Sequence, residues 1–68
     1  MGPGESWKHW KNGTHYKVVA VALHTEREGE ELVVYRKVGE EDGQLYARPL
    51  EMWFEEARPG VPRFVRVG

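Results

Sequence analysis

Three histidines fall within the first 24 positions of this chain, and their imidazoles could in principle bind a metal or act as general bases. His9 and His15 flank an Asn-Gly dipeptide, and His24 ends the apolar run that follows. A zinc site needs three or four convergent ligands, and no His-x-x-x-His or Glu-x-x-His spacing supplies them. We therefore predict no metal site, and expect the histidines to form hydrogen bonds beside their turns. For His24 we expect a ring N–H that donates to a loop carbonyl or to Glu26.

Paired carboxylates are the second set of residues that could do chemistry. They occur as Glu30-Glu31, Glu40-Glu41-Asp42 and Glu55-Glu56. Acid–base catalysis needs environments that push two carboxyl pKa values apart, and a chain of 68 residues offers little pocket for that. These acids are typical of solvated loops, and no nucleophile motif or phosphate-binding glycine loop accompanies them. We predict that the protein is not an enzyme and needs no cofactor.

The aromatic residues favour a binding surface instead. The three Trp, three Tyr and two Phe are too many rings for the interior of a small barrel that also holds Val, Leu and Ala. Trp7 and Trp10 lie on opposite faces of one expected strand, so both cannot point inward. An alternative is that the larger rings only plug the ends of the barrel. The candidate ligand-binding residues are Trp7, His9, Trp10, His24, Tyr35, Tyr46, Arg48 and Trp53.

Arg48 stands immediately before Pro49 and among aromatic residues. Its guanidinium could stack on a ring and still present its fork of donors to a carboxylate or phosphate. The alternative is a structural ion pair with Glu51 or Glu55. Both interpretations stay open from the sequence alone.

Charge is distributed unevenly along the chain, although the net charge is only −1. Both ends are basic and the middle is acidic. If the first and last strands lie side by side, the ends form one basic patch, made of Lys8, Lys11, Lys17, Arg58, Arg63 and Arg66. Such a patch, with Trp7 or Trp10 as stacking platforms, is the basis of an alternative hypothesis in which the protein binds nucleic acid.

Alternating apolar and polar residues predict the elements that must position these side chains. We expect strands at 7–11, 16–24, 32–37, 45–48 and 63–67, with a short helical turn near 50–57 and a hairpin turn at Asn12-Gly13. In the second strand, strict alternation places Tyr16, Val18, Ala20 and Ala22 on one face; in the last, Val65 and Val67 face inward. The pattern predicts a mainly β fold, a small and strongly bent five-stranded antiparallel barrel.

Domain organisation and compartment follow from composition. We expect residues 1–5 to be a flexible lead-in and residues 6–68 a single domain. Cysteine is absent, so disulfides are impossible. No stretch approaches the roughly 20 apolar residues of a membrane span, and no signal peptide opens the chain, so we expect a cytoplasmic protein. Few side-chain amides and many Glu and Arg residues are typical of thermophile proteins.

Short motifs spread along the chain resemble the DUF1653 family of small bacterial proteins. They are His9-Trp10-Lys11, Tyr16-Lys17-Val18, His24-Thr25-Glu26, Val33-Val34-Tyr35-Arg36, Arg48-Pro49, Met52-Trp53-Phe54-Glu55 and Arg63-Phe64. The family more often has a tryptophan or another large aromatic residue where Tyr46 stands. The resemblance implies an SH3-like barrel. It implies no activity, because the family is defined by unknown function.

These observations together predict a non-catalytic binding module. We expect it to be a monomer or a weak homodimer that recognises an extended segment of a protein or peptide through an aromatic and arginine surface. Nucleic acid is the alternative partner, and no membrane partner is expected.

Overall fold

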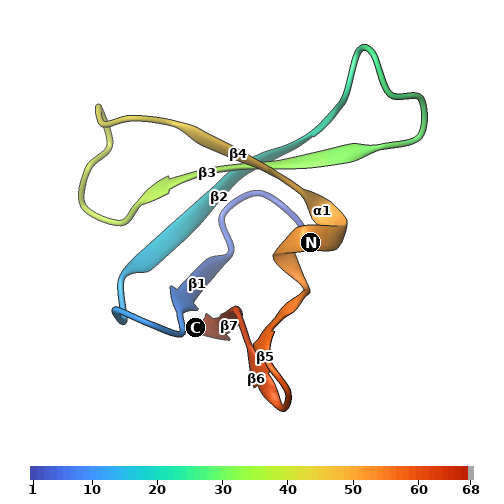
Figure 1. The fold of residues 1–68 in the computed structure, drawn as a ribbon. Helices are drawn as coiled ribbons and strands as arrows, with labels where there is room; N and C mark the ends of the chain where they lie inside the picture. The colour runs from blue at the N-terminus through green and yellow to red at the C-terminus, as the bar shows by residue number, and fades with distance from the viewer. Residues whose placement is uncertain (68) are drawn as a thin grey trace.

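A single curled sheet forms most of the molecule. The computed structural model describes residues 1–67. Five strands form an antiparallel sheet in the order β4-β3-β2-β1-β7, which bends into a half-barrel (Figure 1). The elements are β1 (Ser6–His9), β2 (His15–Leu23), β3 (Glu31–Lys37), β4 (Tyr46–Pro49), α1 (Leu50–Trp53), β5 (Glu56–Arg58), β6 (Val61–Pro62) and β7 (Phe64–Val67). The predicted mainly β, strongly bent antiparallel fold is confirmed. The helix α1 has four residues, and no helix within residues 1–67 is long and apolar enough to cross a bilayer.

The β1–β2 hairpin forms where the Asn-Gly signal predicts it. Gly13 adopts a φ of 71°, a left-handed conformation that glycine reaches without a Cβ clash. The Asn12 Oδ1 atom accepts a hydrogen bond of 2.9 Å from the Thr14 N–H. Asparagine thus closes the turn with its side chain while glycine provides the backbone angle.

A β-bulge in β2 changes which residues face the core. Val18 pairs with Tyr35, but Ala20 pairs with Val34, so the register shifts at Val19. Residues that lie opposite each other in an antiparallel pair share a face of the sheet. Val21, which pairs with the fully buried Val33, therefore faces inward. The predicted alternation is right as far as Val18 and wrong beyond it, because the bulge inserts one extra residue.

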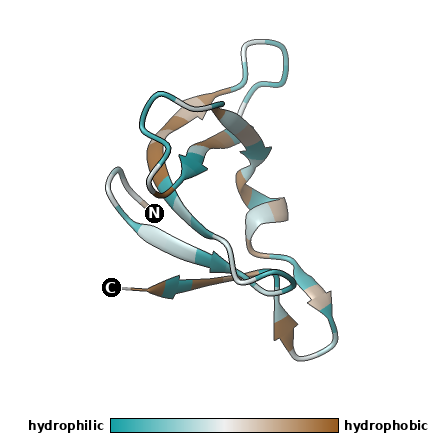
Figure 2. Cartoon of the chain, turned by 90° about the vertical axis from the view of Figure 1, so that its left-hand side faces the viewer, coloured by the Kyte–Doolittle hydropathy of each residue, from teal (hydrophilic) through white to brown (hydrophobic). Residues whose placement is uncertain are grey.

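The core on the concave face of the sheet is small and mostly aromatic. It contains Val18, Val33, Tyr35, Trp53 and Phe64. The Trp53 indole, 1% exposed, lies flat against the Phe64 ring, with ring centroids 3.9 Å apart and planes 3° from parallel. Trp53 ends α1, and Phe64 starts β7, so this contact fixes the helix against the last strand. Hydrophobic residues lie mainly on the strands, and the β2–β3 connection is hydrophilic (Figure 2).

The chain after β4 differs from the expected pattern. The predicted helical turn ends at Trp53, and Glu56–Arg58 instead pairs with Val61–Pro62 in a hairpin that projects from the sheet (Figures 1 and 2). In β7 the inward residue is Phe64, which pairs with His9, whereas Val65 is 49% exposed. The predicted inward position of Val65 and Val67 is wrong by one residue, because burial of the Phe64 ring sets the register.

The segment before β1 is bound to β2 by its backbone. The Gly4 N–H donates to the Val18 carbonyl at 2.9 Å, and the Val18 N–H donates to the Glu5 carbonyl at 2.8 Å. The Glu5 carboxylate accepts a hydrogen bond of 3.2 Å from the Trp7 Nε1–H. Gly4 and Glu5 therefore extend the pairing of β1 along β2.

Deleting residues 1–5 should lower the free energy of unfolding by about 1–3 kcal/mol, the sum expected for a few hydrogen bonds. Urea denaturation followed by tryptophan fluorescence measures this loss. Deleting residues 1–3 is the matched control, because Gly4 and Glu5 keep their bonds to Val18. Equal stability of the two deletion variants would show that the Gly4–Val18–Glu5 pairing contributes nothing.

Candidate ligand-binding site

A hollow of about 320 Å³ opens on the concave face of the sheet, and five side chains from three neighbouring strands line it. The lining residues are Tyr16, Tyr35, Lys37, Tyr46 and Arg48. They share one face because Tyr16 pairs with Lys37, Tyr35 pairs with Tyr46, and Arg48 pairs with the buried Val33. Strands β2, β3 and β4 lie side by side at this position (Figure 1).

The three tyrosine rings form the apolar wall of the hollow. The Tyr35 ring packs edge-on against Tyr16, with centroids 5.3 Å apart, and at a tilt against Tyr46, with centroids 5.6 Å apart. Tyr35 is only 7% exposed, whereas Tyr46 is 39% exposed. Tyr35 therefore supports the wall from beneath, and Tyr46 offers ring surface to a ligand.

Arg48 provides the polar side of the hollow. Its guanidinium carbon lies 5.4 Å from the centroid of the Phe64 ring, within the range of a cation–π contact. Within residues 1–67 no carboxylate lies within 4.0 Å of it, so the alternative of an ion pair with Glu51 or Glu55 is wrong. The Glu55 carboxylate instead faces Arg63 at 3.9 Å, because the backbones of these two residues are joined by a hydrogen bond.

His9 lies next to Arg48 and shares Phe64 with it. The imidazole packs edge-on against the Phe64 ring at a centroid distance of 5.2 Å. Its Nδ1 atom accepts a hydrogen bond of 3.2 Å from the Lys11 N–H, so a neutral ring carries its proton on Nε2. Burial, followed by the positive charges of Arg48, Arg63 and Lys11, lowers the pKa of His9 below 6.5. The local potential beside the hollow is therefore positive.

The lowered pKa of His9 predicts a pH dependence of stability. Between the folded-state pKa and 6.5 the unfolded chain binds more protons than the folded chain, so stability rises with pH in that window. This contribution is complete above 6.5 and is lost as the pH falls through the folded-state value. Urea midpoints at about pH 7.5 and about pH 5.5 measure the difference.

His9→Asn should reduce that difference, because asparagine keeps an acceptor for the Lys11 N–H and cannot gain a proton. His15→Asn is the matched control in the same hairpin, with His9 left in place. An unchanged slope in His9→Asn would contradict the assignment.

Trp53 and Trp7 were both predicted as ligand-binding residues. Trp53 belongs to the core, and Trp7 is partly buried and packs against it. Trp53 is buried beneath the hollow and cannot contact a partner, which corrects its assignment to the surface. The reason is the stack on Phe64, which holds the last residue of α1 against the concave face. Trp7 packs edge-on against Trp53 at 5.7 Å, on the side of the core away from Tyr46.

Trp10 and His24 lie outside the hollow. The Arg58 guanidinium carbon lies 5.5 Å from the Trp10 ring centroid, so the face of the indole is already covered by a cation of the same chain. His24 lies just beyond the far end of β2 from Tyr16. Its Nδ1 atom accepts from the Glu26 N–H at 3.1 Å, so the prediction that His24 donates to this turn is wrong in direction. The reason is that the Glu26 N–H is the group of the turn that lies within reach of the ring nitrogen.

The predicted adjacency of the first and last strands is confirmed, because β1 pairs with β7. The structure nevertheless divides the basic side chains among separate places. Lys8 and Lys17 lie on the convex face, whereas Arg66 pairs with the inward-facing Trp7. Arg58 lies over Trp10, Arg63 faces Glu55, and Lys11 lies in the β1–β2 turn. Strand alternation is the cause, since neighbouring positions point to opposite faces.

Sequence reasoning missed Tyr16 and Lys37 as lining residues of the hollow, and Phe64 as the ring beneath Arg48. Tyr16 and Lys37 are the first inward-facing pair of the β2–β3 hairpin. The sequence contained an indication of this, because strand alternation places Tyr16 on the same face as Val18, and Lys37 on the same face as Tyr35. Lys37 escaped notice because a lysine at a strand end usually indicates a solvated position.

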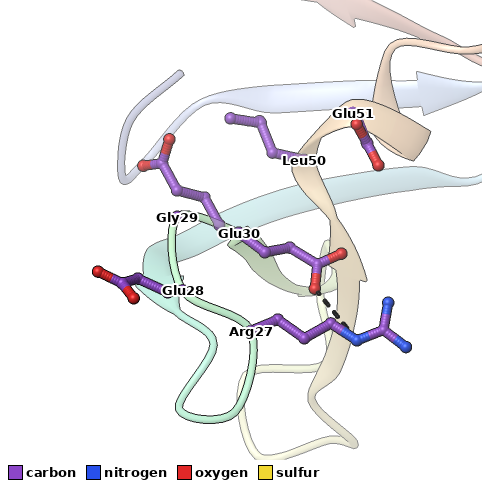
Figure 3. Close-up of a pocket in the computed structure, with 7 residues that line it drawn as sticks. Arg27, Glu28, Gly29, Glu30, Leu50 and Glu51 are labelled. Carbon is purple, nitrogen blue, oxygen red and sulfur yellow. Dashed lines mark ion pairs between the residues drawn. The ribbon is translucent and has the colours of Figure 1, made fainter.

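A second hollow, of about 400 Å³, lies between the β2–β3 connection and α1. It is acidic, with Glu28, Glu30, Glu31 and Glu51 around Arg27. Arg27 pairs with Glu30 at 3.9 Å, and the Glu28 carboxylate points away from this pair (Figure 3). No group of three or more metal-binding side chains occurs within the described residues. The two hollows thus have opposite charge, and only the one at Arg48 combines rings with cations.

A family model described as a protein of unknown function, DUF1653, matches residues 5–66. No curated protein and no solved structure matches the chain. The matched range includes β1 to β4, all but the last residue of β7, and every residue that lines the hollow. The chain therefore belongs to the DUF1653 family.

Proposed function

We propose that this protein is a non-catalytic binding module that holds an extended protein segment in the hollow at Arg48. The observation that carries this proposal is a concave site with three tyrosine rings, a lysine and an arginine that has no carboxylate partner within residues 1–67. At about 320 Å³ it lies at the lower limit of the roughly 300–1,000 Å³ of small-molecule pockets. That volume suits one or two side chains of a longer ligand.

The position of β4 favours an extended chain as the ligand. β4 is an edge strand, and no strand within residues 1–67 pairs with its outer side. A segment that adds to such an edge gains backbone hydrogen bonds, and it points alternate side chains toward the concave face. Val38 and Leu45, each 50% exposed, adjoin Lys37 and Tyr46 in the chain and provide apolar surface beside the hollow.

Nucleic acid fits this surface less well. Single-strand binders combine a continuous cationic groove with exposed rings on which bases stack. Here Arg58 covers Trp10, Trp7 packs on Trp53, and the basic side chains are divided between two faces. Protein recognition therefore accounts for more of the arrangement.

The test is selection of ligands from a displayed library of random nonapeptides, followed by calorimetry with the selected peptides. Tyr46→Ala should weaken binding by roughly tenfold, because it removes the exposed ring of the site. Val65→Ala is the matched control, an exposed apolar truncation on the convex face. Equal affinities of the Tyr46→Ala and Val65→Ala variants, or no selected peptide, would overturn the proposal.

A further inference from the structure

The hollow has a charge pattern that selects its ligand chemistry. Two of its five lining residues, Lys37 and Arg48, are cationic, and none is acidic. Lys11 and Arg63 add positive charge beside it, since both act on His9 together with Arg48. The acid that faces Arg63, Glu55, lies 3.9 Å from it and so is already paired. A ligand that brings a negative charge would therefore complete the site.

Arg48, Arg58 and Arg66 are the three arginines with no carboxylate within 4.0 Å among residues 1–67, and of these Arg48 is the one that lines the hollow. Arg27, Arg36 and Arg63 each face a glutamate, and Arg58 lies over Trp10. Arg48 lines the hollow and contacts a ring only. Its charge is partly desolvated, and no carboxylate of residues 1–67 lies within 4.0 Å of it.

The packing beneath Arg48 holds its guanidinium in place before any ligand arrives. The Phe64 ring under it is 5% exposed and is itself fixed by the flat stack on Trp53. A guanidinium placed on a ring keeps the donors at its edge available, and those donors match the two oxygens of a carboxylate. Such pre-organisation reduces the entropy lost when the ion pair forms.

Resting on the proposed function, we propose that the hollow binds a carboxylate of the extended segment, with Arg48 as the bidentate partner and Lys37 as the second cation. The ring of Tyr46 packs against the aliphatic part of the same residue. The carboxylate belongs either to an Asp or Glu side chain or to a free C-terminus, and these two sources share one chemistry. Phosphorylated segments are an alternative that the test separates.

Binding of a carboxylate has a consequence for His9. A negative charge beside Arg48 offsets the cations that face the imidazole, namely Lys11 from the turn after β1, Arg48 from β4 and Arg63 before β7. The protonated ring is then favoured in the complex, so binding takes up protons near neutral pH. Affinity should rise as the pH falls toward about 6, while an Asp or Glu of the ligand stays ionised.

The experiment uses nonapeptides selected by the full chain and resynthesised in matched forms. One form replaces Asp and Glu with Asn and Gln, a second has an amidated C-terminus, and a third carries phosphoserine in place of the acid. Calorimetry is done with wild type, Arg48→Gln, Arg48→Lys and the distant control Arg66→Gln. NMR titration of His9, free and with each peptide, gives a readout that a purely structural Arg48 would not change.

We expect a loss of affinity of about 10- to 100-fold for whichever form removes the bound carboxylate, Asn/Gln for a side chain or the amide for a C-terminus, and a similar loss for Arg48→Gln. Arg48→Lys should lose less and Arg66→Gln nothing. The pKa of His9 should rise on binding of the acidic peptide and should not rise on binding of the form that lacks the bound carboxylate. Selected peptides that bind through Tyr46 but lose no affinity in either the Asn/Gln form or the amidated form would overturn the carboxylate assignment and leave the proposed function standing. Tighter binding of the phosphoserine form would also overturn it. Failure to select any peptide would overturn the proposed function itself.

Discussion

Replacing Trp53 by alanine should remove a large part of the stability of the fold and lower its melting temperature by at least about 12 °C. Alanine in place of a buried tryptophan costs about 3–5 kcal/mol through lost burial and the cavity left behind. A domain of 68 residues has a free energy of unfolding of only about 3–10 kcal/mol. Trp53 contacts Trp7, Tyr35 and Phe64, so its removal opens the centre of a core that has no disulfide to support it.

Two variants separate this effect from general sensitivity to mutation. Trp53→Phe keeps a ring against Phe64 and deletes a buried indole N–H that has no hydrogen-bond partner within residues 1–67, so its loss should be much smaller. Phe54→Ala truncates the neighbouring ring, which is 59% exposed, and should cost about 1 kcal/mol or less. Thermal unfolding by circular dichroism measures all three, since 1 kcal/mol shifts the midpoint by about 4–8 °C in a domain this size. A Trp53→Ala melting temperature within a few degrees of wild type would contradict the central role of this indole.

Local patterns predicted the strands and the first turn because these depend on neighbouring residues. Alternation over β3 and the Asn12-Gly13 dipeptide act within a few positions, and both appear where they were expected. The bulge at Val19, by contrast, is not determined by residues within a few positions of it. It depends on matching two strands across the sheet, and a run of Val and Ala on both faces offers no local preference for either register.

The course of the chain after β4 depended on one long-range contact. The run Leu50–Ala57 contains good helix formers, which favoured a longer helix. Stacking of Trp53 on Phe64 ends α1 early and turns the chain toward the β5–β6 hairpin. The same contact explains why Trp53 was assigned to the surface, since nothing near it in the chain reveals a partner eleven positions later.

In the candidate site, too, some residues could be predicted from their type, whereas others depend on contacts between distant parts of the chain. Tyr35, Tyr46 and Arg48 were recognised from residue type, because rings beside an arginine suggest recognition. Tyr16 and Lys37 join them only through the register of β2 with β3. The absence of a carboxylate partner for Arg48 within residues 1–67 could not be predicted, because Glu51 and Glu55 are close in the chain and only the fold turns Glu55 toward Arg63.

Replacing Phe64 by alanine should cost about 3–5 kcal/mol and disrupt the hollow as well as the core. Phe64 comes from the edge strand β7, and Arg48 from the opposite edge strand β4, so their contact bridges the open side of the half-barrel. The ring also packs against His9, Tyr16 and Trp53. Its loss removes the support of one edge and the surface on which the guanidinium lies.

Phe64→Leu distinguishes these two roles. Leucine restores most of the buried volume, so the loss of stability should fall to about 1–2 kcal/mol, but it provides no flat ring for Arg48 or Trp53. Burial is the largest cause of the lowered pKa of His9, so the smaller side chain should let that pKa rise toward 6.5. Urea denaturation and NMR titration of His9 measure the two effects in one protein.

A double-mutant cycle between Phe64→Leu and Trp53→Phe isolates the stack itself. Residues in contact couple by about 0.5–3 kcal/mol, whereas sites that share no partner add within about 0.5 kcal/mol. We expect clear coupling here, and none between Phe64→Leu and the exposed Val65→Ala. Additive losses for Phe64 and Trp53 would mean that the two rings stabilise the sheet independently. The contact between Phe64 and Arg48 would then be the one that joins the two edge strands.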